Sequence, residues 1–487
     1  MTSQPTSEQA AEQPIADLTS IIKAYDVRGV VPDQWGPHEA RAIGAAAADI
    51  LGVAHDLDAG TNGQLVIGHD MRPSSPELVD AFAEGVQARG GDVLVIGLCS
   101  TDGLYYASGA LDAPGAMFTA SHNPARYNGI KFCWAGAKAV GQDSGLAEIR
   151  NLATEYLRTG VPQAPRAGRR EHRDLLTDYA TYLRSLVDLS AIRPLKVVVD
   201  AGNGMGGHTA PAVLTDAAGL SALPLDVVPL YFELDGTFPN HEANPLEPKN
   251  LLDLQAAVRR HGADIGLAFD GDADRCFVVD ERGEPVSPSA VTALVALREI
   301  AKETAAGREA TVLHNLITSR VVPELVSGAG ASAVRTRVGH SYIKGEMART
   351  GAVFGGEHSA HYYFREFWGA DTGMLAAMHV LAALGESDGP LSQLVGRYAP
   401  YAASGEINST VDDAAAATER VRAAFANRCG GVDGLDGMTV SGPDSEPMWW
   451  FNLRASNTEP LLRLNVEAAD AATMTAVRDE VLALVRA

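Results

Sequence analysis

The sequence has few cysteines and no long apolar run. Its four cysteines, among 487 residues, lie far apart and form neither a CxxC pair nor a zinc-ligand spacing, so we expect no disulfide framework and a reducing compartment. No apolar run approaches the roughly 18 residues that a membrane-spanning helix needs. The segment from Met1 to Ser20 has no Lys or Arg and no continuous apolar stretch, unlike a secretory signal. These absences predict a cytoplasmic protein without a membrane partner.

Positive charge is also scarce. The chain carries 39 Lys and Arg against 61 Asp and Glu, which gives a formal net charge of -22. Such a molecule repels nucleic acid, so we expect no nucleic-acid partner. An anionic small substrate would meet the same repulsion, and its site would need a local cluster of Lys and Arg.

The pattern of apolar runs predicts three similar α/β layers followed by a different domain. Apolar residues make up 46% of the chain, and 487 residues are more than one core normally contains. Strand-like runs such as residues 64–68, 196–200 and 311–316 alternate with helical stretches, whereas the C-terminal part places two helices around closely spaced strands. We expect a flexible tail at 1–14, α/β domains at 15–165, 166–290 and 291–400, and an α+β domain at 401–487.

Four polar clusters follow the predicted strands, where open α/β sheets bind their ligands. The first is TASHNP at residues 119–124, which contains Ser121 and His122 and is followed by Lys131. A hydroxyl in a tight polar loop, with a lysine further along the chain, suits a nucleophile or a phosphate carrier. Taken alone, the same residues are also typical of a Ser and Asn turn beside a solvated lysine.

The second cluster is DGDADR at residues 270–275. Its carboxylates, Asp270, Asp272 and Asp274, alternate along the chain and offer hard oxygen ligands for Mg²⁺ or Ca²⁺. A calcium EF-hand is excluded because Arg275 stands where that loop requires Gly and because the following CFVVD is strand-like. In a plain acidic turn the three carboxylates would repel one another without compensation, so we favour Mg²⁺ beside a phosphate.

The third cluster is GGEHSAH at residues 355–361. Glu357 and Ser359 offer an acceptor and a donor for sugar hydroxyls, and His361 can move a proton near neutral pH. A histidine in a Gly-rich loop is equally often a hydrogen-bonded structural residue, so this motif alone leaves both interpretations open.

The fourth cluster is RASNTEP at residues 454–460, where a guanidinium, two hydroxyls, an amide and turn N–H groups suit a dianionic phosphate. An ordinary polar turn between strands is the alternative. Two further basic candidates stand outside the clusters: Arg28 in YDVRG, and Lys344 after GHS at residues 339–341.

Together and in this order, the four clusters resemble the α-D-phosphohexomutase family across nearly the whole chain, most closely its phosphomannomutase/phosphoglucomutase branch. The resemblance implies three phosphoglucomutase-like α/β domains and a C-terminal α+β domain around a central cleft. It also implies that Ser121 carries a phosphoryl group and that Mg²⁺ is held at Ser121 by the carboxylates of Asp270, Asp272 and Asp274. Arg275 and His122 are expected beside them.

The resemblance implies roles for other side chains as well. The catalytic candidates are Arg28, Lys131, His340 and His361, without a decision on which is the base. The implied substrate-binding residues are Tyr25, Lys344, Glu357, Ser359, Arg454, Ser456, Asn457 and Thr458. Two departures from the family pattern are Ala273 and Ala360, where several or many members have Gly.

The implied reaction interconverts hexose 6-phosphate and hexose 1-phosphate, with mannose or glucose or both as the sugar. A bisphosphorylated hexose is the intermediate, and the enzyme is expected to be a monomer or homodimer. The alternatives are a phosphoglucosamine mutase, an Mg²⁺-dependent phosphatase with a serine intermediate, and a non-catalytic sugar-phosphate-binding regulator.

Overall fold

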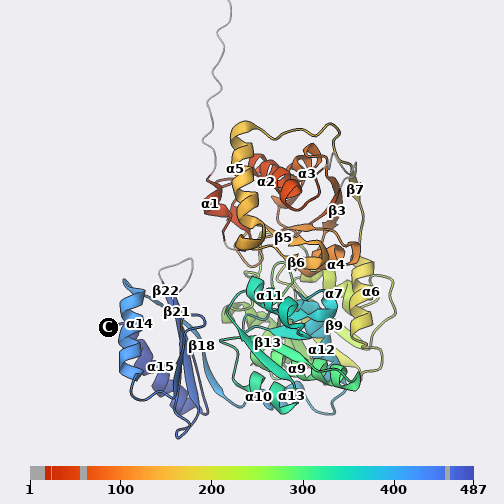
Figure 1. Ribbon diagram of the computed structural model, residues 1–487. Coiled ribbons are helices and arrows are strands. Elements are labelled where there is room, and N and C mark those ends of the chain that lie inside the picture. Colours follow the sequence, from red (N-terminus) through yellow and green to blue (C-terminus); the bar gives the residue numbers. More distant parts are fainter. Residues whose placement is uncertain (1–16, 24, 55–62, 456–460) are drawn as a thin grey trace, which may run out of the picture.

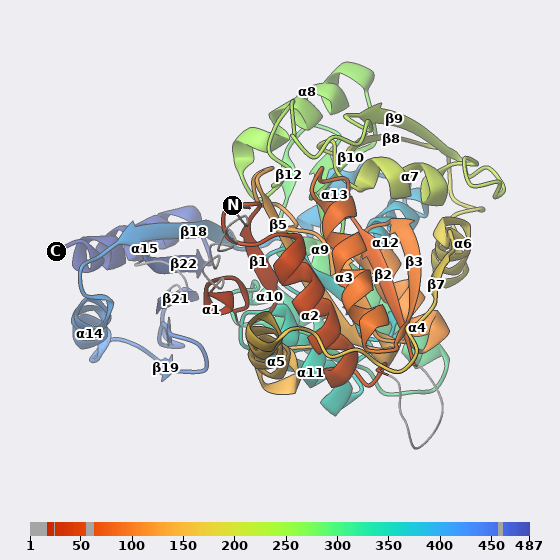
Figure 2. The ribbon, with the colours of Figure 1, turned by 90° about the horizontal axis from the view of Figure 1, so that it is seen from above.

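The computed structural model describes residues 17–23, 25–54, 63–455 and 461–487 (Figure 1). Three α/β domains form one body, and a fourth, smaller domain lies at its side (Figures 1 and 2). Within the described ranges, no helix is long and apolar enough to cross a membrane.

The first domain is a seven-stranded sheet covered by helices on both faces. In strand β2 (Gln64–His69), Leu65 and Ile67 pack into one core with helices α2, α3 and α5. Val66 packs into the core on the other face with α4, because successive side chains of a strand point to opposite faces of the sheet. The strands are β1 (Val27–Val30), β2 (Gln64–His69), β3 (Asp92–Leu98), β4 (Gly115–Phe118), β5 (Tyr127–Trp134), β6 (Lys138–Ala139) and β7 (Arg170–His172). The helices are α1 (Leu18–Ile21), α2 (Pro37–Ile50), α3 (Ser75–Ala88), α4 (Thr101–Leu111) and α5 (Leu146–Thr159), with 3₁₀ turns at Ala135–Ala137 and Gln142–Ser144.

Strand β7 differs from the expected domain organisation. It lies beyond residue 165, where we expected the first domain to end, yet it pairs in parallel with β3 at the edge of the first sheet. The basic, Pro-containing stretch before it is therefore not a simple linker, because the chain returns along the first domain before it enters the second.

The second and third domains repeat one topology around five-stranded sheets. In each, the first strand pairs in parallel with the next two strands, one on either side of it, and a fourth strand runs antiparallel to the third. The second domain contains α6 (Leu176–Leu186), β8 (Leu195–Asp200), α7 (Gly206–Leu214), β9 (Leu225–Leu230), a 3₁₀ turn (Pro248–Leu251), α8 (Leu252–His261), β10 (Ile265–Phe269), β11 (Cys276–Asp280) and β12 (Pro285–Val286). The third contains α9 (Pro288–Ala305), β13 (Thr311–Asn315), α10 (Val321–Gly328), β14 (Ser332–Thr336), α11 (His340–Thr350), β15 (Phe354–Gly356), β16 (Tyr362–Phe364), a 3₁₀ turn (Arg365–Phe367), β17 (Ala370–Asp371), α12 (Gly373–Gly385) and α13 (Leu391–Gly396).

The fourth domain has an antiparallel sheet and a separate core, as its closely spaced strands predict. Its elements are β18 (Ala402–Thr410), α14 (Ala414–Phe425), β19 (Gly431–Asp433), β20 (Met438–Ser441), β21 (Trp449–Ala455), β22 (Leu461–Ala468) and α15 (Ala471–Val485). In contrast, one continuous core runs through the second and third domains.

The repeated topology puts three of the sequence motifs at equivalent positions. Each fills the connection from the third parallel strand to the antiparallel strand: residues 119–126 (the serine loop), 270–275 (the acidic loop) and 357–361 (the histidine loop). Each loop also contains one non-glycine residue with a left-handed backbone, Ser121 (φ 49°), Ala273 (φ 58°) or Ala360 (φ 64°). The two alanines are the positions at which the sequence departs from the family's glycine.

One buried carboxylate joins the three α/β domains. Asp102, at the start of α4, accepts hydrogen bonds from Ser100, from the Tyr179 hydroxyl at 2.7 Å and from Thr372 Oγ1 at 2.6 Å. These donors come from the first domain, from α6 and from the segment between β17 and α12. Burial raises the pKa of Asp102 to about 6.

The Asp102 carboxyl predicts a pH-dependent contribution to stability. Because its pKa is higher in the folded than in the unfolded chain, stability from this group is lost as pH rises from about 4 through 6. We expect Asp102→Asn, which keeps the shape without the charge, to gain about 2 kcal/mol in unfolding free energy relative to the native chain over that window. Thermal unfolding of both proteins between pH 4 and 7.5 measures this difference, and a pH-independent difference would contradict it.

Candidate active site

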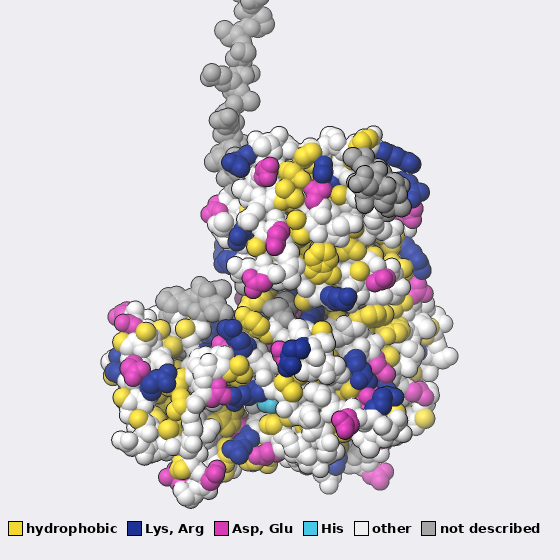
Figure 3. Space-filling view, in the orientation of Figure 1, with side chains coloured by type: hydrophobic (Ala, Val, Ile, Leu, Met, Phe, Trp, Pro, Cys, Tyr) yellow, Lys and Arg dark blue, Asp and Glu magenta, His cyan; other side chains and the backbone are white. Residues whose placement is uncertain are grey.

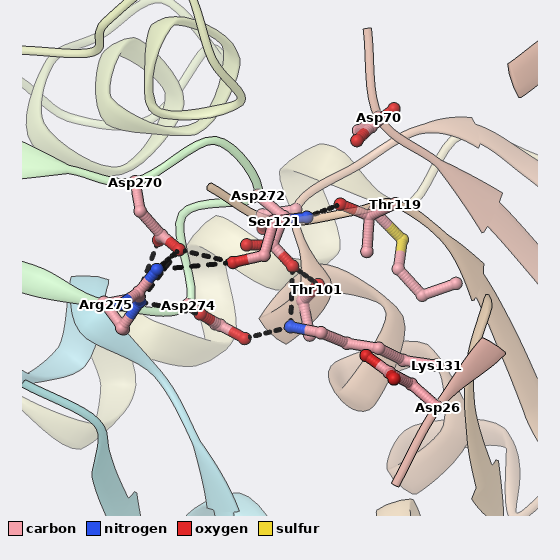
Figure 4. A network of polar contacts seen from close by, with 12 residues as sticks. Asp26, Asp70, Thr101, Thr119, Ser121, Lys131, Asp270, Asp272, Asp274 and Arg275 are labelled. Atoms are coloured by element: carbon pink, nitrogen blue, oxygen red, sulfur yellow. Dashed lines mark hydrogen bonds and ion pairs between the residues drawn. The ribbon is translucent and has the colours of Figure 1, made fainter. Parts of the chain in front are cut away.

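The serine loop and the acidic loop meet between the first and second domains (Figure 4). The Ser121 hydroxyl donates a hydrogen bond to Asp270 Oδ2 at 2.8 Å, and the Ser121 side chain is almost fully buried. A Cβ atom at Gly271 would lie 2.4 Å from the Ser121 carbonyl oxygen, so only glycine lets the two loops approach this closely. The structure thus brings the expected phosphate carrier directly onto the expected metal ligands.

The three carboxylates of the acidic loop fit a divalent cation. Oxygen atoms of Asp270, Asp272 and Asp274 lie within 4.8 Å of one another, and all three residues are buried. Asp272 Oδ1 and Asp274 Oδ1 have no hydrogen-bond partner among the described residues. Buried anionic oxygens without partners are costly unless a cation satisfies them, and hard oxygen donors suit Mg²⁺.

Lys131 partly neutralises this cluster. Its Nζ lies 2.7 Å from Asp272 Oδ2 and 2.6 Å from Asp274 Oδ2. Burial opposes the charged form, but the two carboxylates outweigh it and raise the pKa of Lys131 above its usual value. The pKa of Asp272 is lowered because Lys131 outweighs the effect of burial. In this arrangement Lys131 is held in its charged form.

Arg275 and His122 complete the surroundings of the Ser121 hydroxyl. Arg275 Nη2 lies 2.8 Å from Asp270 Oδ2, 3.4 Å from Ser121 Oγ and 2.6 Å from His122 Nδ1. Burial and the nearby guanidinium lower the pKa of His122 well below its usual value, so its neutral ring can accept this hydrogen bond. Burial raises the pKa of Asp270 to about 7 in spite of Arg275, a shift that a bound cation would oppose.

The histidine loop lies against the acidic loop. His361 Nε2 is 3.8 Å from Asp274 Oδ1, and its Nδ1 is 2.9 Å from Ser359 Oγ. Glu357 is buried, with hydrogen bonds from Asn315 Nδ2 at 3.2 Å and from the Tyr363 hydroxyl at 2.7 Å. Three expected residues of this loop are therefore adjacent to one another and to a metal-site carboxylate.

Three other expected residues have partners outside the acidic loop. Lys344 is largely buried, with its Nζ 2.7 Å from Asp371 Oδ1 and 3.8 Å from the Tyr105 ring centroid. Arg28 Nη1 donates to Asn123 Oδ1 of the serine loop at 2.8 Å. The Tyr25 ring packs edge to face on Tyr342, at 6.4 Å between centroids.

Arg454 is the one predicted fourth-domain residue that lies within the described ranges, and it bonds within its own domain. Arg454 Nη2 lies 2.9 Å from Glu406 Oε2 within its own domain, which stands apart from the first domain on the face shown in Figure 3. Ser456, Asn457 and Thr458, predicted to bind the substrate phosphate, lie outside the described residues. His340 begins α11, but its side chain also lies outside the described part of the structure.

Sequence reasoning missed several residues that hold the site. Thr101 contributes its backbone N–H, 3.0 Å from the Asp272 carbonyl oxygen, and its hydroxyl, 2.6 Å from Asp272 Oδ2. Arg72 donates to carbonyl groups of the serine loop, and Asn315 and Tyr363 hold Glu357. Arg72 follows strand β2, so the rule that ligand sites lie beyond strand carboxyl ends was the signal available for it.

Comparisons with known proteins match each of the four domains. Family models described as phosphoglucomutase/phosphomannomutase alpha/beta/alpha domains I, II and III match residues 19–158, 177–283 and 288–401. The C-terminal domain model of the same family matches residues 406–484. The four matches follow the order of the four domains of the structure.

Similar proteins cover nearly the whole chain. A phosphohexose mutase of Xanthomonas campestris is 40% identical over 96% of this chain and 99% of its own length. A phosphomannomutase of Escherichia coli is 38% identical over the same shares of the two chains. The crystal structure of a phosphoglucomutase/phosphomannomutase family protein from Burkholderia thailandensis superposes with a TM-score of 0.82 at 30% identity, and it covers 96% of this chain and 97% of that one.

The acidic loop predicts cation-dependent stability. We expect Mg²⁺ or Mn²⁺ to raise the unfolding temperature of the native chain, with a gain of about 2.7 kcal/mol in unfolding free energy at a concentration 100-fold above the dissociation constant. The nearly isosteric Asp274→Asn should lose most of this increase, because it removes one anionic ligand. Asp280→Asn is the control, since Asp280 is a buried carboxylate of the same hairpin that bonds Arg282 instead. An equal cation effect in Asp274→Asn and the native chain would exclude the site.

Proposed function

Because the chain belongs to the phosphoglucomutase/phosphomannomutase family and is a phosphohexomutase, we propose that it interconverts the 6- and 1-phosphates of mannose, glucose or both through phosphorylated Ser121. The observation that carries this assignment is the buried Ser121 hydroxyl, which is bonded to Asp270 and lies beside Arg275. A nucleophilic oxygen, three metal-type ligands and a guanidinium converge there, as phosphoryl transfer requires.

In the proposed reaction Ser121 alternates between a phosphorylated and a bare hydroxyl. Phosphorylated Ser121 gives its phosphoryl group to the free hydroxyl of a hexose monophosphate, so the Oγ–P bond breaks, a sugar O–P bond forms and the sugar hydroxyl loses its proton. The bisphosphorylated sugar then turns over, and bare Ser121 takes the other phosphoryl group. Arg275 Nη2, 3.4 Å from Ser121 Oγ, is placed to stabilise negative charge on that oxygen.

The cation of the acidic loop is Mg²⁺ in this proposal. Held by Asp270, Asp272 and Asp274, it would neutralise charge on the group in transfer. Lys131, protonated between two of these carboxylates, can return a proton to the serine oxygen when the phosphoryl group leaves it. We assign proton acceptance from the sugar hydroxyl to His361, whose ring lies between Ser359 and Asp274.

Sugar recognition follows from the histidine loop and the fourth domain. Glu357 and Ser359 are proposed to bind the 3- and 4-hydroxyls, which glucose and mannose share, and this leaves the C2 epimer undistinguished. Arg454 is proposed to bind the existing phosphate together with Ser456, Asn457 and Thr458. Because Arg454 is paired with Glu406 within its own domain, we expect the fourth domain to approach Ser121 when the substrate binds.

The remaining expectations stay predictions. The substrate of a phosphoglucosamine mutase differs from glucose phosphate by an amino group at C2. A binding protein without catalysis would not need Ser121 placed against Asp270. We also propose a cytoplasmic enzyme, since all four cysteines, each within the described ranges, are free thiols. A monomer or homodimer is expected.

Intact-mass spectrometry tests the phosphoserine. We expect a substantial share of the purified chains to carry one phosphate, because phosphate monoesters are intrinsically slow to hydrolyse. Ser121→Ala should remove this phosphate and lower mutase activity at least about 10³-fold. Ser144→Ala, at an exposed serine outside the loop, is the control.

The substrates are compared in the same preparation. Activities on mannose 1-phosphate and glucose 1-phosphate are expected within about 10⁴-fold of each other. Unphosphorylated native protein, or phosphate release as fast as isomerisation, would contradict the proposal. A strong preference for glucosamine phosphate would move the protein to the alternative branch.

Two neighbouring tyrosines test the role of Glu357. Tyr363→Phe removes the hydrogen bond to Glu357 Oε2, so we expect KM for the sugar phosphate to rise about fivefold, equivalent to about 1 kcal/mol, with kcat little changed. Tyr362→Phe is the matched control, because the Tyr362 hydroxyl is buried without a hydrogen-bond partner in the described part of the chain. Steady-state kinetics distinguish the two variants, and equal KM values would show that the Tyr363 bond to Glu357 does not support sugar binding.

A further inference from the structure

Arg72 bonds one stretch of backbone through four of its five donor groups. A guanidinium has five N–H donors, and here each one has an acceptor. Arg72 Nε donates to Asp70 Oδ2 at 3.1 Å. The other four donors reach backbone carbonyls of the serine loop and of the strand that follows it, at Ser121 (2.9 Å), Asn123 (2.7 Å), Pro124 (2.9 Å) and Tyr127 (2.8 Å).

The Arg72 side chain is itself fixed by its surroundings. Both it and its ion-pair partner Asp70 are fully buried. Asp70 Oδ1 accepts further hydrogen bonds from the Arg72 N–H at 3.0 Å and from Ser75 Oγ at 2.9 Å. Asp70 thus compensates the charge of Arg72, and the planar Arg72 guanidinium is held in one orientation. A flexible lysine ammonium cannot reproduce this arrangement.

The second domain closes over the same arginine. The Phe238 ring centroid lies 5.3 Å from the Arg72 guanidinium carbon. A Cβ atom at Gly236 would lie 2.7 Å from the Arg72 Cα, so the two backbones are in close contact. Arg72 therefore lies between the serine loop and the domain that supplies the acidic loop.

The serine loop needs such support for two reasons. Ser121 has φ 49°, a left-handed conformation that costs a non-glycine residue about 1–2 kcal/mol and persists only when its surroundings enforce it. Its hydroxyl must also keep its position while the charge of a phosphoryl group comes and goes. Hydrogen bonds to the backbone carbonyls hold the loop without contacting the reacting oxygen.

We propose that Arg72 is a positioning residue for phosphoryl transfer: its five-fold hydrogen bonding holds Ser121 Oγ in line with the acidic loop. This inference rests on the proposed phosphoserine mechanism. It assigns Arg72 an effect on the transfer steps and not on binding of the sugar phosphate, because Arg72 bonds the backbone of the serine loop and none of the side chains proposed to bind sugar.

The test compares Arg72→Lys with a matched variant, Arg184→Lys. Arg184 in the second domain also donates to three backbone carbonyls, those of Val213, Thr215 and Ser221, but away from the site. Arg72→Lys keeps the charge and loses the fork. We expect its kcat to fall about 10²-fold with KM within about threefold of the native value, as a misplacement near 1 Å would cause. The ³¹P resonance of its phosphoserine should shift or broaden.

Arg184→Lys should lower the unfolding temperature while leaving kcat and the ³¹P resonance unchanged. If Arg72→Lys also lowers the unfolding temperature without changing kcat or the ³¹P resonance, Arg72 contributes only to stability and the inference is wrong. Should Arg72→Lys fail to fold, Asp70→Asn replaces it: a severalfold lower kcat with unchanged KM supports the inference, and native kcat overturns it. Native protein that carries no phosphate on Ser121 would instead remove the proposed mechanism itself, independently of either variant.

Discussion

Concentrated negative charge at the acidic loop is the constraint on which the rest of the structure depends. Three buried carboxylates within 4.8 Å of one another are stable only if cations and hydrogen bonds compensate them. Lys131, Arg275 and Thr101 each contribute, from the first or the second domain. The two domains are thus held together by the same interactions that prepare the site.

The distribution of charge also explains how an acidic protein can accept an anionic substrate. The formal net charge of -22 describes the whole chain, but the side chains around Ser121 include Arg28, Lys131 and Arg275 in a small volume. A phosphorylated ligand responds mainly to this nearby field, because salt screens charges that lie beyond about 8–10 Å in solvent. The overall charge therefore disfavours a nucleic-acid partner but does not exclude a phosphate site.

The sequence predicted the strands and the contacts between motifs better than it predicted the residues that hold those motifs in place. The apolar runs at β2, β8 and β13 and the meeting of Ser121 with Asp270 follow from local pattern and from the family resemblance. The sequence did not predict that Lys344 pairs with Asp371 or that Arg72 bonds the serine loop. In each case the packing of the fold brings together residues that are distant in the sequence. Likewise, β7 extends the first sheet past the expected boundary because three residues pair at an edge, too short a strand for periodicity to reveal.

The continuous core of the second and third domains has a consequence for how the chain unfolds. Units that share an apolar core lose it together, whereas units with separate cores can open separately. The largest core joins the second and third domains and also contains Tyr105, Cys133 and Ala137 of the first domain, whereas the C-terminal domain has a core of its own. The C-terminal domain should therefore open separately, and the second and third domains should unfold together. The acidic and histidine loops then lie on one unit, so their mutual spacing is preserved when the C-terminal domain opens, while Arg454 belongs to the unit that opens.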